Sequence, residues 1–586
     1  MKRVLSLALL SAAALPLSSS PLRDAATAPG EGAAVLFYGG TIHRLDLGGT
    51  APDGTPLPPA RDASARAHEA LLAEDGVIVA IGDFETVSGM EEAQDAELVD
   101  LEGGHAFPGF QDAHGHVERY GALLEAVDLR GCPSFEELIR RVEERAAALP
   151  KGQWVRGHGW DQTLWPGGRF PEHAELSARV PDHPVLVQRI DGHAVLANRA
   201  ALALAGLAGE SLPEDPAGGR IVRDGKRTTG VFIDTAMELV RAHVPDPTDE
   251  VRQRHILLAQ DALLARGITC VHDMGEDPSG ARLLRALEAG GELRMRVVGY
   301  MRASEIEAAR GFEGVKQPFD DRDVYGVPGV KFVLDGALGS RGAALIEEYS
   351  DAPGERGLAR FDADRFARRV DLAARAGLQP ATHAIGDRAN RTVLDAYERV
   401  QQRGTDLSKL RPRIEHAQVV APFDFARFGS LGVIPSMQPT HATSDMRWAV
   451  ERLGEQRAKG AYAWRRLSNS TPLPLAFGSD FPAEQPDPLL GFHASLTRQD
   501  ASGNPKDGFF PAERLDASAA LSAITSGAAF AAGQEDRRGR LAPGYGCDLT
   551  VVDVDLTRLN AGTADTALDA QILMTVVNGA VLFRGE

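Results

Sequence analysis

Two histidines two residues apart, His114 and His116, form the first group in the chain whose spacing suggests metal chemistry. They close the run PGFQDAHGH at residues 108–116. In an extended strand, residues i and i+2 project to the same face, so the two imidazoles point the same way. Neutral imidazole nitrogens suit zinc and similar divalent ions. An HxH pair by itself is weak evidence for a metal site, and further ligand-type residues are needed to support it.

Three more ligand-type residues each close a strand-like apolar run just before a turn or helix. His383 lies in PATHAIGD, His416 lies in RIEHAQ, and Asp480 ends LPLAFGSD. In an α/β barrel, side chains at the carboxyl ends of the strands converge on one rim, where active sites lie. The sequence therefore predicts a metal centre with four histidines and one aspartate as ligands.

Lys331 is one of only eight lysines in the chain and lies inside the apolar run VKFVL. Burial disfavours the ammonium form, so a lysine in such a place loses its proton readily. A neutral amine can form a Schiff base, or can react with carbon dioxide to give a carbamate that bridges two cations. The residues alone leave open whether Lys331 does either or is an ordinary ion-paired lysine.

The elements that must hold these residues alternate along the middle of the chain. Strand-like runs such as 267–275 and 328–336 are separated by helical stretches such as 251–266 and 363–376. This alternation predicts a parallel sheet covered by helices. The length between the first and last motifs suits a (β/α)8 barrel with an inserted α/β subdomain at about 130–245.

Short β-branched segments at both ends of the chain predict a second, smaller unit. Strand-like segments occur near the N-terminus, and similar segments occur at 547–556 and 572–585 near the C-terminus. One small β-sandwich built from both termini is the economical interpretation. The predicted order is a signal peptide at 1–28, the first part of the sandwich at 29–107, the (β/α)8 barrel with the metal centre at 108–500, and the last barrel helices with the second part of the sandwich at 501–586.

The first twenty residues, MKRVLSLALLSAAALPLSSS, predict export. Lys2 and Arg3 precede an apolar run that is too short to span a bilayer and is followed by small residues, as in a cleaved signal. The segment Ala26-Thr27-Ala28 offers a small-x-small cleavage site. We therefore expect a periplasmic or secreted protein with no stable membrane insertion once the signal is removed.

The composition excludes several other classes of protein. Hydrophobic residues make up 43% and charged residues 25%, which are ordinary globular values. The net charge of −19 disfavours nucleic acid as a partner. Three cysteines without a CxxC pair argue against a disulfide framework or a cysteine-ligated zinc site. We expect a small-molecule substrate, and a homodimer is the default for a large barrel.

In chain order, PGFQDAHGH, VKFVLDGALGSRGAAL, THAIGDRA, IEHAQ and FGSDFP resemble the motifs of the amidohydrolase superfamily. The long second motif resembles the branch that includes N-substituted formamide deformylases. The likeness covers roughly residues 33–586. It implies an α/β fold with a distorted (β/α)8 TIM barrel and the β-sandwich described above. It also implies one or two divalent metals per chain, with zinc as the expected ion.

The resemblance assigns the ligands to two metals. His114, His116 and Asp480 would bind the more buried metal, and His383 and His416 the second. A carboxylated Lys331 would bridge them if the site is binuclear. The activity that the resemblance implies is hydrolysis of a non-peptide C–N bond, in an N-acyl or N-formyl amide or a cyclic amide. Metal-activated hydroxide would attack, with Asp480 as general base and then general acid.

Several residues outside the ligand set are candidates for supporting roles. Substrate contacts are predicted for four of them: Arg341, Trp160, Asp161 and His193. Asp387 and Glu415 are candidates for orienting ligand histidines. Two other functions compete with the hydrolase. One is a mononuclear metal-dependent deaminase of a heterocycle or aryl amine with an unmodified Lys331, and the other is a non-catalytic binding or regulatory protein on the same fold.

Overall fold

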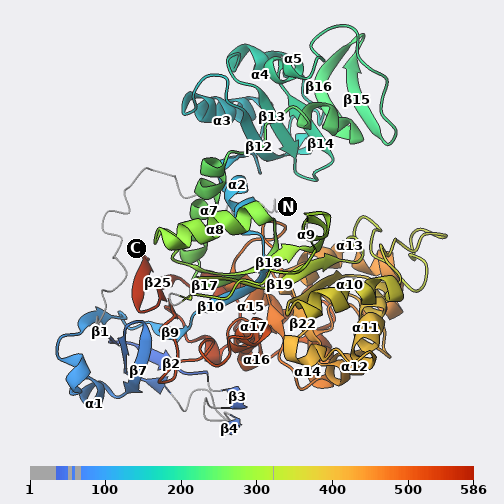
Figure 1. Ribbon diagram of the computed structural model, residues 1–586. Helices are drawn as coiled ribbons and strands as arrows, with labels where there is room; N and C mark the ends of the chain where they lie inside the picture. Colours follow the sequence, from blue (N-terminus) through green and yellow to red (C-terminus); the bar gives the residue numbers. More distant parts are fainter. Residues whose placement is uncertain are drawn as a thin grey trace, which may run out of the picture.

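The chain folds into a barrel, an inserted α/β subdomain and a β-sandwich, as the computed structural model shows (Figure 1). The structure describes residues 34–45, 47–50, 56–59, 67–309, 311–320 and 323–585. The predicted signal peptide lies outside the described residues. In Figure 1 the barrel occupies the centre, the inserted subdomain lies at the top and the sandwich at the lower left. This arrangement confirms the predicted fold class.

The barrel is an eight-stranded parallel sheet in the order β10-β17-β18-β19-β20-β21-β22-β23. Its strands are β10 (Phe110–Gly115), β17 (Ile268–Glu276), β18 (Arg296–Arg302), β19 (Tyr325–Val333), β20 (Gln379–Ala384), β21 (Arg413–His416), β22 (Ile434–Met437) and β23 (Ala476–Phe477). A parallel bridge between Gly115 and Phe481 brings the first and last strands together. A Cβ on Gly115 would lie 2.2 Å from Cε1 of Phe481, so the closure requires glycine at this position.

Helices cover the outside of the barrel. They are α2 (Val117–Glu125), α7 (Asp249–Leu264), α8 (Pro278–Ala289), α9 (Ala303–Ala309), α10 (Ala363–Arg375), α11 (Asp387–Gln402), α12 (Phe425–Leu431), α13 (Pro439–Ala458), α14 (Trp464–Ser470), α15 (Pro488–Thr497), α16 (Ala517–Ala523) and α17 (Ser526–Ala531). Helix α10 shows why they form. The side chain of Asp362 caps its first turn, and Phe366, Val370 and Ala373 recur at helical spacing on the buried face.

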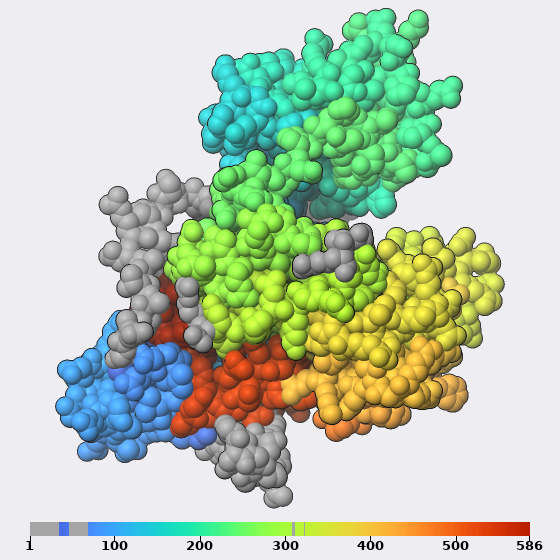
Figure 2. Space-filling model, viewed as in Figure 1, coloured from blue at the N-terminus to red at the C-terminus, as the bar shows by residue number. Residues whose placement is uncertain are grey.

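The inserted subdomain is a mixed six-stranded sheet with its own helices. Its sheet order is β11-β12-β13-β14-β16-β15. Its elements are β11 (Val127–Asp128), α3 (Phe135–Ala147), β12 (Val155–Trp160), α4 (His173–Arg179), β13 (Val185–Arg189), β14 (Ala194–Ala197), α5 (Arg199–Leu204), β15 (Gly219–Asp224), β16 (Arg227–Asp234) and α6 (Glu238–Arg241). It has a hydrophobic core of its own and projects from the barrel beside α2 and α7 (Figure 2).

The β-sandwich draws strands from both ends of the chain. One sheet has the order β7-β6-β1-β8 and the other β26-β25-β24-β9-β2-β5, and a separate hairpin pairs β3 with β4. These strands are β1 (Ala34–Tyr38), β2 (Thr41–His43), β3 (Leu47–Thr50), β4 (Pro56–Pro59), β5 (Ala67–His68), β6 (Ala70–Glu74), β7 (Val77–Gly82), β8 (Glu97–Asp100), β9 (His105–Pro108), β24 (Leu549–Val552), β25 (Ile572–Val577) and β26 (Ala580–Arg584), with short helices α1 (Phe84–Ser88) and α18 (Thr566–Asp569). Phe37 and Leu71 from the first sheet pack in one core with Val551 and Val576 from the second. The two termini therefore build one unit, as predicted.

A helix able to cross a bilayer is not found in the described part of the chain, where no helix combines sufficient length and apolarity.

Candidate metal centre

The six predicted metal ligands line one cavity of about 1050 Å³ at the carboxyl ends of the barrel strands. They are His114 on β10, His116 directly after it, Lys331 on β19, His383 on β20, His416 at the end of β21 and Asp480 after β23. Parallel pairing places the ends of these strands on the same rim, which is why residues hundreds of positions apart meet there. The structure therefore brings together the complete set that the sequence predicted.

A buried carboxylate orients the ring of His114. Nδ1 of His114 lies 2.7 Å from Oε2 of Glu415. The other carboxylate oxygen, Oε1, accepts a hydrogen bond from the Arg413 guanidinium at 2.6 Å. Burial is the largest influence and would raise the pKa of Glu415, but the charge of Arg413, the hydrogen bond from His114 and the charge of Lys331 together outweigh it and hold that pKa well below its usual range. An ionised carboxylate can only accept, so Nδ1 of His114 carries the proton and donates it. The lone pair on Nε2 is thereby left facing the cavity.

Nε2 of His114 meets two further groups of the predicted centre. It lies 3.1 Å from Nζ of Lys331 and 3.5 Å from Oδ1 of Asp480, and the same oxygen is 3.1 Å from Nε2 of His116. Burial, followed by the charge of Lys331, lowers the pKa of His114 to about 3, so the imidazole is neutral as a metal ligand must be. Burial also lowers the pKa of Lys331 to about 8, which gives it a neutral fraction in mildly alkaline solution.

The other two histidines also face oxygen atoms of neighbouring side chains. Nδ1 of His416 lies 2.7 Å from Oε1 of Gln438, an amide oxygen that can only accept, which leaves Nε2 of His416 free. Nε2 of His383 faces Oδ1 of Asp335 at 3.4 Å. The rings of His383 and His416 lie 4.5 Å apart between centroids. The ring of His416 is therefore positioned by a hydrogen-bonded oxygen, an arrangement typical of metal-binding histidines, whereas Nε2 of His383 makes no hydrogen bond to Asp335.

Backbone strain accompanies the ligand positions on two strands. His416 has φ 72° and Asp480 has φ 62°, both in the left-handed region that non-glycine residues rarely adopt. Asp480 is tied there by its amide, which donates to the carbonyl of His114 at 2.7 Å. Strain of this kind persists where the surroundings hold it and is common at functional sites. Here it turns the side chains of the two strand ends toward the cavity.

The donor set fits a divalent metal. Ligand atoms of His114, His416 and Asp480 lie within 4.8 Å of one another. Two of the histidines present an unprotonated nitrogen because their other nitrogen is bonded to a fixed acceptor, and Asp480 contributes a carboxylate oxygen. Imidazole and carboxylate together match the preferences of catalytic metal sites.

A family model described as "Amidohydrolase family" matches residues 97–583. The chain belongs to the amidohydrolase family. Among its relatives, LONG AFTER FAR-RED 3 of Arabidopsis thaliana is 32% identical over 534 residues, with 89% of each chain covered. N-substituted formamide deformylase of Arthrobacter pascens is 28% identical, covering 89% of this chain and 96% of the relative. An uncharacterised metal-dependent hydrolase from Pyrococcus horikoshii OT3 aligns with a TM-score of 0.72 at 30% identity, covering 90% of this chain and 99% of that one.

These comparisons confirm the resemblance seen in the motifs. The family match and the hydrolase relatives, together with the histidine and aspartate cluster, make this amidohydrolase a metal-dependent hydrolase of C–N bonds. The match begins near the end of the first sandwich segment and continues to the last strand of the chain. It therefore includes the barrel and the inserted subdomain as well as the ligands.

Three predicted substrate contacts of the amidohydrolase lie in the inserted subdomain. Trp160 is fully buried in its core, where Nε1 donates to the carbonyl of Val187 at 2.9 Å. Asp161 caps a short turn and pairs with Arg189 at 3.1 Å. His193 is exposed and pairs with Asp234 at 2.8 Å. None of the three is among the described residues that line the cavity, so their role in substrate binding stays a prediction.

Arg341, the fourth predicted contact, belongs to the loop after β19. Residues 337–339 of this loop line the cavity. The guanidinium of Arg341 is directed instead to Asp351, whose carboxylate lies 2.7 Å away and also pairs with Arg452. The geometry thus shows the loop-stabilising ion pair, and a substrate contact by Arg341 stays a prediction.

The residues that orient the ligands were only partly visible in the sequence. Glu415 was a candidate, and it contacts His114 rather than the adjacent His416, because neighbouring strand residues face opposite sides. Asp387 instead accepts hydrogen bonds from the backbone amides of Ile346 and Arg388. Asp335 and Gln438 were missed. Asp335 directly follows the VKFVL run, and that position at a strand end was the available signal.

The cavity wall carries further charged groups. Asp273 and Glu276 come from the end of β17, and burial raises the pKa of Asp273 to about 6. His441 lies 3.8 Å from Oδ2 of Asp480. His272, by contrast, is buried behind the wall, where Nδ1 lies 2.9 Å from the Arg413 guanidinium. The rim therefore offers acidic and imidazole groups to a substrate beside the ligand cluster.

Proposed function

We propose that this amidohydrolase acts on a small molecule with a non-peptide amide bond, in an N-acyl or N-formyl amide or a cyclic amide. The observation that carries the proposal is the position of Asp480. Its carboxylate stands on the cavity wall with Oδ1 against His114 and His116 and Oδ2 toward His441. The similarity to a formamide deformylase supports the N-formyl class in particular.

Asp480 has the surroundings of a proton-transfer group. Burial alone would raise its pKa, but the contacts with the surrounding imidazoles, first His114 and then the hydrogen bond from His116, hold it well below the usual range. The carboxylate is therefore ionised at neutral pH and able to accept a proton from an attacking water molecule. A divalent metal held by the surrounding histidines and Asp480 would supply the Lewis acidity that makes water nucleophilic at neutral pH. Asp480 then returns the proton to the leaving nitrogen, so one carboxylate serves as base and then acid.

We further propose that the metal is zinc and that, when two ions are bound, a carboxylated Lys331 joins them. The support is the position of its amine, 3.1 Å from a ligand nitrogen of His114, together with its burial. Carboxylation forms one N–C bond between the neutral amine and carbon dioxide and releases one proton. The product carries a negative charge and two oxygens, which suit two cations better than an ammonium group does.

The replacement Asp480→Asn tests the catalytic assignment. We expect the variant to keep its fold and most of its metal while kcat falls by about 10²–10⁴, the usual contribution of a positioned acid–base group. Asp536→Asn, an exposed aspartate far along the chain from the cavity ligands, serves as the control. The assay follows amine release from N-formyl and N-acyl amines and ammonia release from heterocyclic amines. Near-wild-type kcat in Asp480→Asn would remove that residue from the acid–base role, and ammonia release alone would favour the deaminase.

We also propose that the protein is exported, on the basis of its first twenty residues. Expression of the full chain in a Gram-negative host, followed by fractionation and N-terminal sequencing, tests this. A protein that stays in the cytoplasm with Lys2 and Arg3 intact would contradict it.

A further inference from the structure

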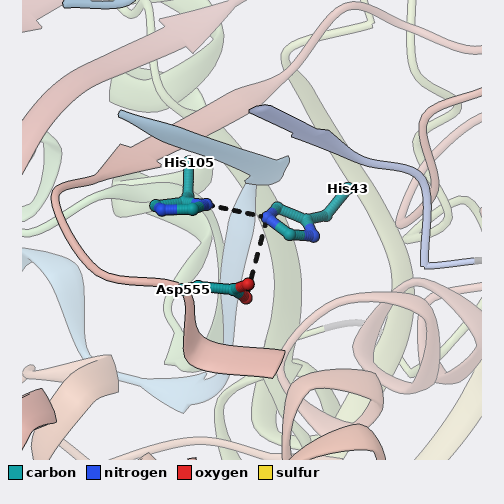
Figure 3. Close-up of side chains that lie close together, drawn as sticks. All are labelled: His43, His105 and Asp555. Carbon is teal, nitrogen blue, oxygen red and sulfur yellow. Dashed lines mark hydrogen bonds and ion pairs between the residues drawn. The ribbon is translucent and has the colours of Figure 1, made fainter. Parts of the chain in front are cut away.

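Two histidines and an aspartate meet in the β-sandwich, outside the barrel. His43 ends β2, His105 begins β9, and Asp555 directly precedes the short turn η7 (Leu556–Arg558). Figure 3 shows the three side chains pointing toward one another from three separate segments. Nε2 of His43 lies 3.1 Å from Nδ1 of His105 and 3.8 Å from Oδ1 of Asp555. The three potential ligand atoms all lie within 4.8 Å of one another.

Strand pairing on both sides of β9 creates this meeting point. On one side β9 pairs in parallel with β2, with Thr41 opposite His105, so His43 follows two residues further along. On the other side β9 pairs antiparallel with β24, with Val552 opposite His105. The chain leaves β24 and reaches Asp555 three residues later. The backbone of one sheet therefore holds both rings, and the segment that follows β24 brings the carboxylate beside them.

The distances resemble the edges of a metal coordination shell. Zinc binds nitrogen and oxygen ligands at about 2.0–2.2 Å in a tetrahedron, which places neighbouring ligand atoms about 3.3 Å apart. The separations of 3.1 and 3.8 Å from His43 lie on either side of that value. Two neutral imidazoles that face each other through nitrogens share only one proton between them. A cation would use both lone pairs at once.

The surroundings hold each group in place. The ring of His43 is only 2% exposed and stacks on Phe107, with 4.6 Å between centroids and 6° between planes. The carboxylate of Asp555 accepts hydrogen bonds at Oδ1 from the amide and hydroxyl of Thr557, at 3.1 and 2.5 Å. Its Oδ2 pairs with Arg558 at 3.0 Å. Ligating carboxylates are commonly fixed in this way by outer hydrogen bonds.

We propose that His43, His105 and Asp555 form a second metal site, which takes zinc or a similar borderline divalent cation. Two imidazoles and one carboxylate suit such ions, whereas calcium and magnesium prefer oxygen ligands throughout. His105 and Asp555 are partly exposed, which leaves an entry path and room for water as the fourth ligand. The ion joins the N-terminal and C-terminal parts of the sandwich, because His43 and His105 come from the first part of the chain and Asp555 from the last.

Metal counting tests the site. Full-length protein is stripped with a chelator, reloaded with Zn²⁺, freed of excess ion and analysed for zinc per chain. We expect His105→Ala and Asp555→Asn each to bind one zinc ion fewer per chain than wild type. Zinc should also raise the thermal midpoint of these variants less than that of wild type, because only the barrel site still binds. All the variants keep the barrel ligands, so the barrel contributes equally to every count.

Asp565→Asn is the matched control. Asp565 also pairs with a buried histidine, because its Oδ1 lies 2.9 Å from Nε2 of His493, but within the described part of the chain this pair belongs to no group of three potential metal ligands. It should bind as much zinc as wild type. Unchanged zinc content in a folded His105→Ala would overturn the proposal.

A second measurement uses only the wild-type protein, so it tests the site even if His105→Ala does not fold. Amide hydrogen exchange of the stripped wild-type protein is compared with and without Zn²⁺. We expect added protection in peptides that cover 41–43, 105–108 and 553–558, besides any protection in the barrel strands. Protection confined to the barrel would refute the sandwich site while leaving the proposed barrel chemistry intact.

Discussion

Glu415→Gln perturbs the ion pair behind the metal centre and separates two of its effects. The Glu415 carboxylate binds His114 at 2.7 Å and Arg413 at 2.6 Å, and all three side chains are at most 1% exposed. Glutamine keeps the size of the side chain and one acceptor oxygen but removes the charge. Arg413 then keeps hydrogen bonds to Ser436 and to the carbonyl of Ala113, without a buried counter-charge.

The expected magnitude follows from burial. Removing one partner of a fully buried ion pair costs about 3–5 kcal/mol because the remaining charge is uncompensated. Losing the carboxylate that orients a ligand histidine weakens metal affinity by about 10- to 100-fold, which corresponds to about 1.4–2.7 kcal/mol. Glu415→Gln should therefore show both a large loss of unfolding free energy in the metal-free protein and weaker metal binding.

Gln438→Met is the comparison that isolates the second effect. It removes the acceptor for Nδ1 of His416 but leaves every charge in place. We expect metal affinity to fall by a similar factor, while the unfolding free energy falls by only about 1–3 kcal/mol, the cost of one buried neutral donor left without its acceptor. The assays are chemical denaturation of stripped protein and competition titration with a chromophoric chelator. If Glu415→Gln loses less than about 1 kcal/mol and binds metal normally, the orienting role assigned to this carboxylate is wrong.

Two further predictions concern pH and packing. Burial lowers the pKa of Lys331 to about 8, so between pH 8 and about 10.5 the unfolded chain holds a proton that the folded, metal-free chain lacks. In CO2-free buffer, wild type should gain up to about 3 kcal/mol over Lys331→Met across that window, and parallel pH profiles would contradict the assignment. Gly121→Ala should lower the unfolding free energy by about 1–3 kcal/mol, because its Cβ would lie 1.7 Å from the carbonyl oxygen of His255. Gly491→Ala in α15 would meet no atom within 4 Å and should raise the unfolding free energy by about 0.5–1 kcal/mol. Equal effects of the two substitutions in chemical denaturation would refute the packing argument.

Much of the fold was accessible from local patterns. Apolar runs ending in His383, His416 and Asp480 predicted strands with functional ends, and the helices between them showed apolar faces at helical spacing. The β-branched ends of the chain predicted the sandwich. These features depend on neighbours within a few residues, so the sequence displays them directly.

The groups behind the ligands could not be predicted in the same way. Glu415 reaches His114 across 301 positions of sequence, and their strands β21 and β10 are not adjacent in the sheet, so only closure of the barrel brings the two side chains together. The substrate contacts predicted in the insertion show the opposite case. Trp160 carries a large apolar ring, and the subdomain has a core of its own in which to bury it. The substrate contact stays a prediction, and packing within the subdomain decided where the ring lies.

The sequence by itself determined which atoms are available for metal chemistry and on which side of each strand they project, because the alternation of side chains along a strand is a local property. Strand order, closure through Gly115 and Phe481, and the ion pair of Arg413 with Glu415 were decided by the tertiary structure. The meeting of His43, His105 and Asp555 was decided there as well. Contacts between distant segments depend on how whole sheets pair and pack, and no short pattern in a chain encodes that pairing.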